Sequence, residues 1–417
     1  MWQGGGSCAK LPSMKYEDAQ STSPVASLSP TCTAWACTVI ALGALVSGCR
    51  DSNASGAGGS VALAPSLTGT DGCNGTDQVF TVAQAFTPIA LGSWVGDSMS
   101  QVAGARGEEH LFLSGANATL FKVDLTGVGA PVVTQLITAG VVQALVDPLV
   151  SGAAPVLSGL CVLDADNLLV MEHSFNVILL VSRLVPDSVT LFAGLPLASP
   201  GNADGPASLA RFSFSEAASV IATGDGTVFV ADSGNHSIRS LKGDFVSTIA
   251  GSGSPFFADG DLQSVFFDTP SGLSLTCSGR LLISELGLGL GGGHRIRSLE
   301  LGALTFFGQA GTVETLAGDG TPASVQGAGG LASVAGPMSP VTTADGEMYW
   351  IDGDTGILRR RLPADESIDC PLWIDCASVV PGSERFTPMG LTTLVASDGG
   401  VLYALDAMAG TLVRVTP

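Results

Sequence analysis

Three of the four histidines in this sequence have similar surroundings, because each follows a short apolar run that ends in Glu or Asp. They are His173, His236 and His294. Asp-Gly pairs recur in the segments between such runs, at Asp204, Asp259 and Asp319. Imidazole nitrogens and carboxylate oxygens are ligands that zinc takes in proteins. The set can therefore form a zinc centre if the chain brings it together; otherwise each histidine serves its own turn.

Two other acidic groups resemble fragments of calcium-binding loops. They are Asp164-Ala165-Asp166 and Asp352-Gly353-Asp354. A complete loop of that type alternates its ligands over a longer span and closes with a glutamate, and neither group has that spacing. Asp beside Gly or Ala at the end of a strand is typical of a turn, so we expect turn chemistry, with calcium as the alternative.

The sequence contains neither a Gly-x-Ser-x-Gly nucleophile turn nor a Gly-x-x-x-x-Gly-Lys phosphate loop. Its basic cluster is Arg359-Arg360-Arg361. These residues lie in a predicted strand, where neighbouring side chains point to opposite faces of the sheet. We expect them to pair with surface carboxylates rather than with a ligand.

The elements that must position these residues recur along the chain about every 58 residues. Each copy has a strand-like run of apolar residues, and a second run that ends in Gly follows it. The first runs are Leu111–Gly115, Leu168–Glu172, Val228–Asp232, Leu281–Glu285, Met348–Asp352 and Leu402–Asp406. The second runs are Ile137–Gly140, Thr190–Gly194, Thr248–Gly251 and Thr315–Gly318, with a weaker copy at Ala377–Gly382. A fixed period of this length indicates a repeat architecture.

The third copy resembles the NHL-repeat family of β-propellers, particularly its bacterial extracytoplasmic type. The matching segments are Asp204–Ala207, Ala210–Phe212, Gly226–Arg239 and Val246–Gly251. Asn235, His236 and Ile238 carry the pattern that names the family. The resemblance implies an all-β, six-bladed propeller of four-stranded antiparallel blades over roughly residues 76–417. His236 and His294 occupy the family's own turn position, where the residue serves the blade.

A ring of six blades needs one more strand than the last copy supplies. The chain ends at Pro417, directly after the third strand of copy six. Gln78–Val82 alternates polar and apolar residues and lies just before copy one. We therefore expect this segment to pair into the last blade, because an open array would leave unpaired strand edges.

The segment before the repeats looks like a targeting sequence. Residues Ala34–Gly48 form an apolar run of about 15 residues, the length of a signal-peptide core. Leu45–Cys49 resembles the lipobox of bacterial lipoproteins, in which the cysteine is lipidated. The residues upstream depart from the usual short basic region, so an uncleaved anchor or a cleaved secretory signal are the alternatives. Arg50 stands where such lipoproteins carry a retention Asp, which favours the outer membrane.

The predicted domains are therefore a targeting segment at 1–48, a tether at 49–75 and a propeller at 76–417. The tether contains Asp51–Gly72, which is rich in Gly, Ser and Ala. Cysteine usage fits an oxidising compartment, and we expect a disulfide between Cys370 and Cys376. Cys161 and Cys277 are expected in the core. With Cys73 the count after Cys49 is odd, so at least one thiol stays free.

Charge excludes some classes of partner. The 417 residues carry 17 basic and 37 acidic side chains, a net charge of −20. Nucleic-acid affinity rests on Lys and Arg that neutralise phosphates, so a nucleic-acid partner is not expected. The sequence predicts a monomeric, lipid-anchored or secreted propeller that binds a protein, peptide or glycan. The alternative is a metal-dependent lyase or lactonase-like hydrolase with its site at the channel mouth.

Overall fold

The computed structural model describes the strands and most connections of the repeat region. The described residues are 86–89, 101–104, 110–125, 131–146, 154–196, 199–215, 217–276, 278–288, 292–305, 308–343, 346–369, 391–396, 402–406 and 411–415. They all belong to the unit Cys49–Pro417. None of the helices among them is both long enough and apolar enough to span a bilayer.

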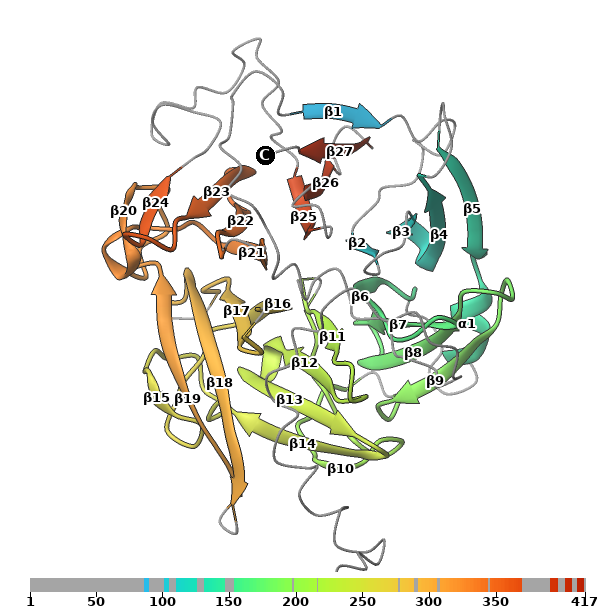
Figure 1. Ribbon diagram of the computed structural model, residues 1–417. Helices are drawn as coiled ribbons and strands as arrows, with labels where there is room; N and C mark the ends of the chain where they lie inside the picture. Colours follow the sequence, from blue (N-terminus) through green and yellow to red (C-terminus); the bar gives the residue numbers. More distant parts are fainter. Residues whose placement is uncertain are drawn as a thin grey trace, which may run out of the picture. The chain divides into compact units, whose positions relative to one another are not determined.

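These residues form six antiparallel sheets, here called blades 1 to 6 in chain order (Figure 1). Blade 1 contains β2 Gln101–Gly104, β3 His110–Gly115, β4 Thr119–Asp124 and β5 Val132–Ile137. Blade 2 contains β6 Leu157–Val162, β7 Asn167–Glu172, β8 Val177–Ser182 and β9 Val189–Ala193. Blade 3 contains β10 Gly205–Pro206, β11 Val220–Ala222, β12 Val228–Asp232, β13 Ser237–Lys242 and β14 Phe245–Ala250.

The remaining blades follow the same plan. Blade 4 contains β15 Gly260–Asp261, β16 Pro270–Leu275, β17 Leu281–Glu285, β18 Arg295–Thr305 and β19 Gly308–Ala317. Blade 5 contains β20 Gly327–Ala328, β21 Pro337–Thr342, β22 Met348–Asp352, β23 Ile357–Arg361 and β24 Ser367–Asp369. Blade 6 contains β25 Leu391–Ala396, β26 Leu402–Asp406, β27 Thr411–Val415 and β1 Phe86–Ile89. Short helices are α1 Val141–Val146, η2 Ala116–Ala118, η3 Ser233–Asn235 and η4 Gly329–Leu331.

The propeller fold predicted from the repeats is confirmed, with two corrections. All six predicted first runs are second strands of their blades, within one residue at the ends. Blades 3, 4 and 5, however, have five strands rather than four. In each of them a two-residue strand from the incoming connection pairs outside the outer strand, as β10 does with β14.

The ring closes through an N-terminal strand, as expected, but a different segment supplies it. β1 pairs antiparallel with β27, with Phe86 opposite Val415 and Ile89 opposite Leu412. Gln78–Val82, the segment that we expected to do this, lies outside the described residues. Pro88 argues against a strand in sequence patterns, yet proline is tolerated on an outer edge, where its missing N–H faces no ladder partner. That explains why the alternation pattern favoured the wrong segment.

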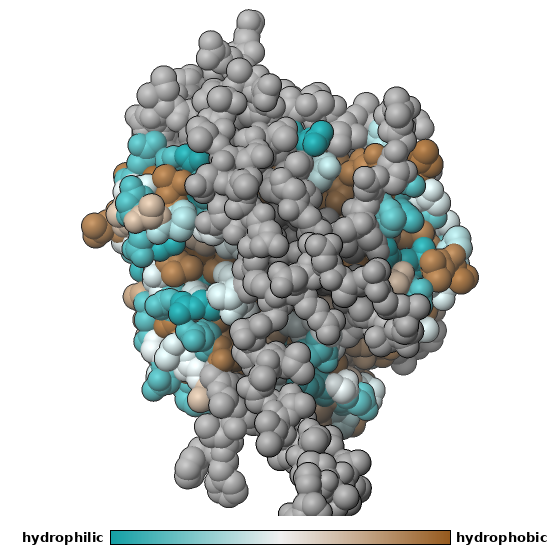
Figure 2. All heavy atoms as spheres, viewed as in Figure 1, coloured by the Kyte–Doolittle hydropathy of each residue, from teal (hydrophilic) through white to brown (hydrophobic). Residues whose placement is uncertain are grey.

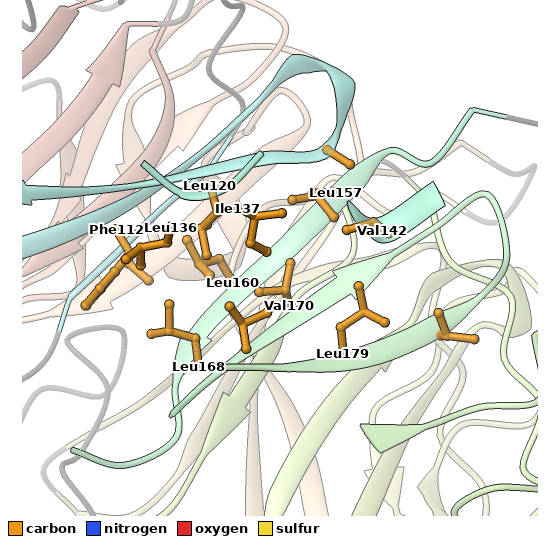
Figure 3. Close-up of a cluster of buried hydrophobic side chains, with 14 of the residues drawn as sticks. Phe112, Leu120, Leu136, Ile137, Val142, Leu157, Leu160, Leu168, Val170 and Leu179 are labelled. Carbon is orange, nitrogen blue, oxygen red and sulfur yellow. The ribbon is translucent and has the colours of Figure 1, made fainter. Parts of the chain in front are cut away.

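The blades stack face to face, so most strands are buried on both sides. The innermost strands β2, β6, β11, β16, β21 and β25 each lie beside the next, and β25 lies beside β2. A separate apolar cluster fills the space between each of several neighbouring pairs of blades. Figure 3 shows the one between blades 1 and 2, where Phe112 and Leu120 face Leu160 and Val170. Burial on both faces explains why the strands read as continuous apolar runs.

In blades 3 and 4, a buried arginine on the third strand pins the incoming connection to the sheet. In blade 3, Arg239 Nη1 donates to Asp232 Oδ2 at 2.6 Å and to the Arg211 carbonyl at 3.0 Å. Its Nη2 donates to Asp204 Oδ1 at 2.6 Å and to the Ala203 carbonyl at 3.1 Å. Arg239 and Asp232 are both fully buried. Breaking one half of such a pair costs about 3–5 kcal/mol, because the other charge stays buried and uncompensated.

Blade 4 repeats this arrangement, which we call the arginine clamp. Arg297 pairs with Glu285 at 2.9 Å and with Asp259 at 2.6 Å. Its guanidinium also donates to the carbonyls of Ala258 and Phe266, at 2.8 and 3.2 Å. The clamp therefore holds the connection between blades 3 and 4 at both ends of its loop.

Blade 5 has an incomplete clamp. Arg359 pairs with the buried Asp352 at 2.6 Å and donates to the Val325 carbonyl at 3.0 Å. The residue after Val325 is Gln326, at the place that Asp204 fills in blade 3. Where Asp204 accepts from the arginine Nε, the Nε of Arg359 is buried and has no hydrogen-bond partner. An unsatisfied buried donor lowers stability by about 1–3 kcal/mol.

We expect Gln326→Asp to complete the third clamp and raise the free energy of unfolding by about 1 kcal/mol, because Arg359 Nε gains a charged acceptor. Urea denaturation followed by circular dichroism measures the change. The matched control is Asp204→Gln, which copies blade 5 into blade 3 and should lower stability. If Gln326→Asp has no effect or destabilises the protein, the equivalence of the two positions is wrong.

Candidate functional site

The turns between second and third strands lie at the same end of the blades as the connections to the next blade. In blade 3, Ile238 at the start of β13 pairs with Ala250 at the end of β14. The turn Ser233–His236 and the connection that leaves Ala250 therefore emerge together. We call this side of the ring the turn face. It carries the predicted histidines and the Asp-Gly pairs.

Two of the three histidines link neighbouring blades. His236 Nδ1 accepts a hydrogen bond from the Thr269 N–H of blade 4 at 3.2 Å. His294 Nδ1 accepts one from the Gly336 N–H of blade 5 at 3.0 Å. Both histidines have left-handed backbones, with φ of 49° and 50°. The resemblance implied that these residues serve the blade, and the contacts show that they serve the joint between blades.

The third histidine, His173, makes no such link, since its Nδ1 is buried without a hydrogen-bond partner. Among the residues that the structure describes, no group of three His, Cys, Asp or Glu side chains is placed to hold a metal ion. The Asp-Gly carboxylates have other partners. Asp204 and Asp259 belong to the arginine clamps. The histidine set thus serves separate contacts in the described part of the chain.

Asp319 is not the equivalent of Asp204 and Asp259, although its Asp-Gly pair suggested so. Its carboxylate accepts from the Thr321 N–H at 2.7 Å and from the Ser333 hydroxyl at 3.0 Å. The equivalent position in blade 5 is Gln326, one residue before β20. The sequence pattern matched Asp319-Gly320 to the Asp-Gly pairs of blades 3 and 4, but Asp319 is not at the equivalent position. Blade 5 has glutamine there instead of aspartate.

The two acidic groups considered for calcium have internal partners. Asp164 Oδ1 accepts from the Asp166 N–H at 2.8 Å and from the Asn167 amide at 3.0 Å, which is a turn contact. Asp352 accepts from Arg359, from Trp350 Nε1 at 2.9 Å and from the Ser324 hydroxyl at 2.6 Å. These are the roles expected of turn and clamp residues.

The prediction that Arg359–Arg361 pair with surface carboxylates is confirmed for two of the three residues. Arg360 pairs with Asp369 at 2.7 Å and Arg361 with Glu366 at 2.9 Å. It is wrong for Arg359, because its partner Asp352 is fully buried. Of the cysteines, Cys161 is buried, as expected of a core residue. Cys49, Cys73, Cys277, Cys370 and Cys376 lie outside the described residues, so the lipidation and disulfide remain predictions.

Blade 4 departs from blades 3 and 5 on the turn face, first in its incoming connection. Ala203, Ala258 and Val325 are equivalent, because the carbonyl of each accepts from the arginine of its clamp. Phe256-Phe257 thus stands where blade 3 has Gly201-Asn202. Blade 5 has Ala323-Ser324 at these positions. Phe256 is 55% exposed and Phe257 41%, so neither ring is needed to fill the core.

The turn and the third strand of blade 4 also differ from those of blades 3 and 5, and they do so near the same place. Between β17 and β18 the chain runs from Leu286 to His294, whereas blades 3 and 5 use four residues each. Leu288 in this longer turn is 74% exposed. Arg295 begins β18, opposite Glu285, where blade 3 has Ser237 and blade 5 has Ile357.

Arg295 connects these departures into one patch. Its guanidinium lies 3.8 Å from the Phe257 ring centroid, and Nη1 and Nη2 donate to the carbonyls of Gly293 and Asp319, both at 2.9 Å. A Cβ on Gly320 would press on this guanidinium and force it to shift, and the φ of 90° at Gly320 also favours glycine. Burial lowers the pKa of Arg295, and nearby Glu285 opposes the shift. We call Phe256, Phe257 and Arg295 the blade 4 patch.

A strained residue lies beside this patch at the start of the innermost strand. Thr269 has φ of 59°, a left-handed value that is unusual for a β-branched residue. The equivalent residue in blade 5 is Gly336, which adopts φ of 56° without a Cβ. The Thr269 hydroxyl donates to the buried Asp268 at 3.2 Å, and Asp268 accepts from the Gly293 N–H at 3.3 Å. These two hydrogen bonds join the longer turn to the residue that precedes the innermost strand β16.

Sequence reasoning found the histidines but missed the two phenylalanines. The signal was available, since Phe256-Phe257 directly precedes Ala258-Asp259, where the better-matched third copy has Gly-Asn. The partner of Phe257 could not be found in this way, because Arg295 is distant in sequence and becomes a neighbour only in the folded blade.

This chain is an all-β propeller, and its fold is similar to several solved propellers. Virginiamycin B lyase from Staphylococcus aureus has 11% identity and a TM-score of 0.46, with 80% of this chain and 99% of that chain covered. An auxiliary nutrient binding protein from Bacteroides thetaiotaomicron has 12% identity and a TM-score of 0.47, with 74% and 66% covered. The WD40 propeller domain of Doa1 has 10% identity and a TM-score of 0.45, with 80% and 96% covered.

No protein-family model and no curated protein sequence matches this chain. A fold shared at such low identity does not carry an activity with it. The function must therefore be argued from the residues of this chain.

We expect His236 to make the protein less stable in mild acid. Burial lowers the pKa of His236, and the Asp268 carboxylate partly opposes this. In the unfolded chain His236 takes up a proton near pH 6.5, whereas in the folded chain it stays neutral to a lower pH. The stability that neutral His236 contributes is therefore fully present above pH 6.5 and is lost as the pH falls toward the pKa of the folded state. The measurement is the melting temperature between about pH 7.5 and 5.5.

The test variant is His236→Asn, whose Oδ1 can accept from Thr269 and whose backbone tolerates the left-handed region. It should melt near the wild-type temperature above neutrality and lose less stability on acidification. An identical pH dependence in the two proteins would show that His236 does not titrate in this way.

Proposed function

We propose that this chain is an extracytoplasmic propeller of the NHL type that binds a protein, peptide or glycan partner on its turn face, at the blade 4 patch. The supporting observation is that three departures from the repeat meet at one place. The exposed phenylalanines, the longer turn and Arg295 come from three separate segments. Blades 3 and 5 fold without any of them, so their presence in blade 4 is not required by the architecture.

The composition of the patch supports a binding role. Interfaces are enriched in aromatic residues, and Phe256 and Phe257 are both exposed. On the face that Figure 2 shows, apolar residues of the described part stand among hydrophilic ones. Single exposed apolar residues need no functional explanation, whereas apolar side chains gathered beside a held arginine do.

The alternative function, a metal-dependent lyase or lactonase-like hydrolase, has less support. It requires several ligating side chains at the channel mouth. The described residues provide no such group, and the imidazoles of His236 and His294 already accept hydrogen bonds from neighbouring blades. We therefore favour binding over catalysis.

The proposed location is the cell envelope, with Cys49 lipidated and residues 49–75 acting as a tether. The support is the sequence alone: the apolar run, the lipobox-like Leu45–Cys49 and the Gly/Ser-rich segment after it. We also propose a disulfide between Cys370 and Cys376, which would close a short loop in the connection that leaves blade 5.

We expect Phe256→Gly/Phe257→Asn, which copies blade 3 into blade 4, to weaken partner binding by about tenfold or more, because aromatic anchors carry much of the energy of an interface. The probe is a displayed random-peptide library together with a glycan array, screened against the full chain in detergent. Ligands enriched by the wild type should not be enriched by the variant.

The matched control is Phe245→Ser, because Phe245 on the outer strand of blade 3 is 54% exposed and lies outside the patch. It should leave binding unchanged. Circular dichroism confirms that both variants are folded. Ligands that bind wild type and Phe256→Gly/Phe257→Asn equally well would place the binding surface elsewhere.

We expect Cys49→Ser to move the protein from the membrane fraction to the soluble fraction of cells that express it, because the thiol that takes the lipid is lost. Fractionation followed by immunoblotting measures this, and Cys73→Ser serves as the control. If Cys49→Ser leaves the partition unchanged, the protein is held at the membrane in some other way.

A further inference from the structure

We infer that the blade 4 patch binds a cationic peptide segment that carries an apolar side chain. This inference rests on the proposed function and names its class of ligand. It follows from the fact that the phenylalanine rings and carboxylates at the patch are exposed, whereas the guanidiniums are buried.

The apolar half of the patch is held in place before any ligand arrives. Phe256 packs edge-to-face against Phe266, with ring centroids 5.8 Å apart. Phe257 is held by Arg295 at 3.8 Å and lies 5.0 Å from the Arg297 guanidinium. Aromatic rings that are already ordered lose little conformational freedom on binding, which favours affinity. The patch therefore offers a rigid apolar surface rather than a flexible loop.

The positive charge of the patch faces inward. Arg295 is only 8% exposed, and its guanidinium donates to the backbone carbonyls of Gly293 and Asp319. Arg297 is fully buried in its clamp. Neither guanidinium is available to an incoming anion, so an acidic peptide or a phosphate finds no exposed cation here.

The charges that face outward are carboxylates. The Asp259 side chain is 41% exposed although it pairs with Arg297, and Asp319 is exposed. Burial tends to raise the pKa of Asp319, but hydrogen bonds from Thr321 and Ser333 outweigh it and lower the pKa, so this carboxylate is charged at neutral pH. With the buried Glu285, three carboxyl groups lie near the guanidiniums of Arg295 and Arg297.

Charge complementarity therefore selects a cationic partner. A chain with a net charge of −20 attracts cations over a distance, and the exposed carboxylates beside the phenylalanines keep this attraction at the patch. Lys or Arg can lie beside Asp259 and Asp319 while a neighbouring apolar side chain covers Phe256. A neutral glycan would contact only the apolar ring of Phe256, and an anionic surface would be repelled by the exposed carboxylates.

The experiment uses three fluorescein-labelled peptides of equal length, titrated into the full chain in detergent. Lys-Leu-Lys-Leu-Lys has both features, Glu-Leu-Glu-Leu-Glu has reversed charge, and Lys-Ser-Lys-Ser-Lys lacks the apolar side chains. We expect the first to bind at least about tenfold more tightly than either of the others. Its affinity should fall as NaCl rises from about 0.05 M to about 0.5 M, which shortens the Debye length.

Variants separate the two features. Asp319→Asn should weaken the Lys-Leu peptide about threefold and reduce its salt dependence, because one exposed charge is removed. Phe256→Ser should weaken it about tenfold with the salt dependence unchanged. Glu300→Gln, a charge change away from the patch, is the matched control and should leave binding as in the wild type.

Equal or tighter binding of the Glu-Leu peptide would overturn the inference on charge. If that binding were still lost in Phe256→Ser, the patch would remain a binding site and only its ligand class would be wrong. If no peptide distinguishes the wild type from Phe256→Ser, the inference fails, whereas the proposed function fails only if the peptide library and the glycan array also yield no ligand that distinguishes wild type from Phe256→Gly/Phe257→Asn.

Discussion

The buried contact between an arginine on the third strand and the carboxylates around it is the interaction on which the central part of this propeller depends. In blades 3 and 4 the guanidinium joins the end of the second strand to the connection that arrives from the previous blade. Without it, that connection would have several backbone carbonyls near a buried interface and no donors to satisfy them. The clamp thus fixes the loops of the turn face, and the candidate site is built on one of those loops.

The ring uses a different solution where the clamp is absent. In blade 2, Leu179 stands opposite Val170, as Arg239 stands opposite Val230 in blade 3. Leu179 packs in the apolar cluster between blades 1 and 2, which Figure 3 shows. Apolar packing and a fully bonded ion pair are two ways to fill the same position, and burying an ion pair is not inherently the more stable of them. The ion pair differs from apolar packing in that its hydrogen bonds have a defined geometry, so it holds one loop in one position.

Much of this fold could be predicted from the sequence, because a repeat shows its pattern several times. The second strands and the outer strands of blades 2 to 4 were found from their shared runs, and the need for a closing N-terminal strand followed from counting strands. The outer strand of blade 5 was missed, because it is Ser367–Asp369, whereas the predicted run Ala377–Gly382 lies outside the described residues. The details that depend on one copy could not be found in this way. Pro88 made the closing strand unlike a strand in the sequence pattern. Gln326 replaces the aspartate that would have marked the equivalent of Asp204 in blade 5. The blade 4 patch joins Phe257 to Arg295, which no local pattern connects.

The closing of the ring has a mechanical consequence. The four-residue ladder between β1 and β27 joins the first described segment of the chain to the last one. A pulling force applied to the chain before Phe86 therefore acts first on this ladder, at the end where Phe86 lies opposite Val415. Backbone hydrogen bonds loaded from one end break one after another rather than together. A load borne at the start of the chain would thus open blade 6 and leave the clamped blades 3 to 5 folded.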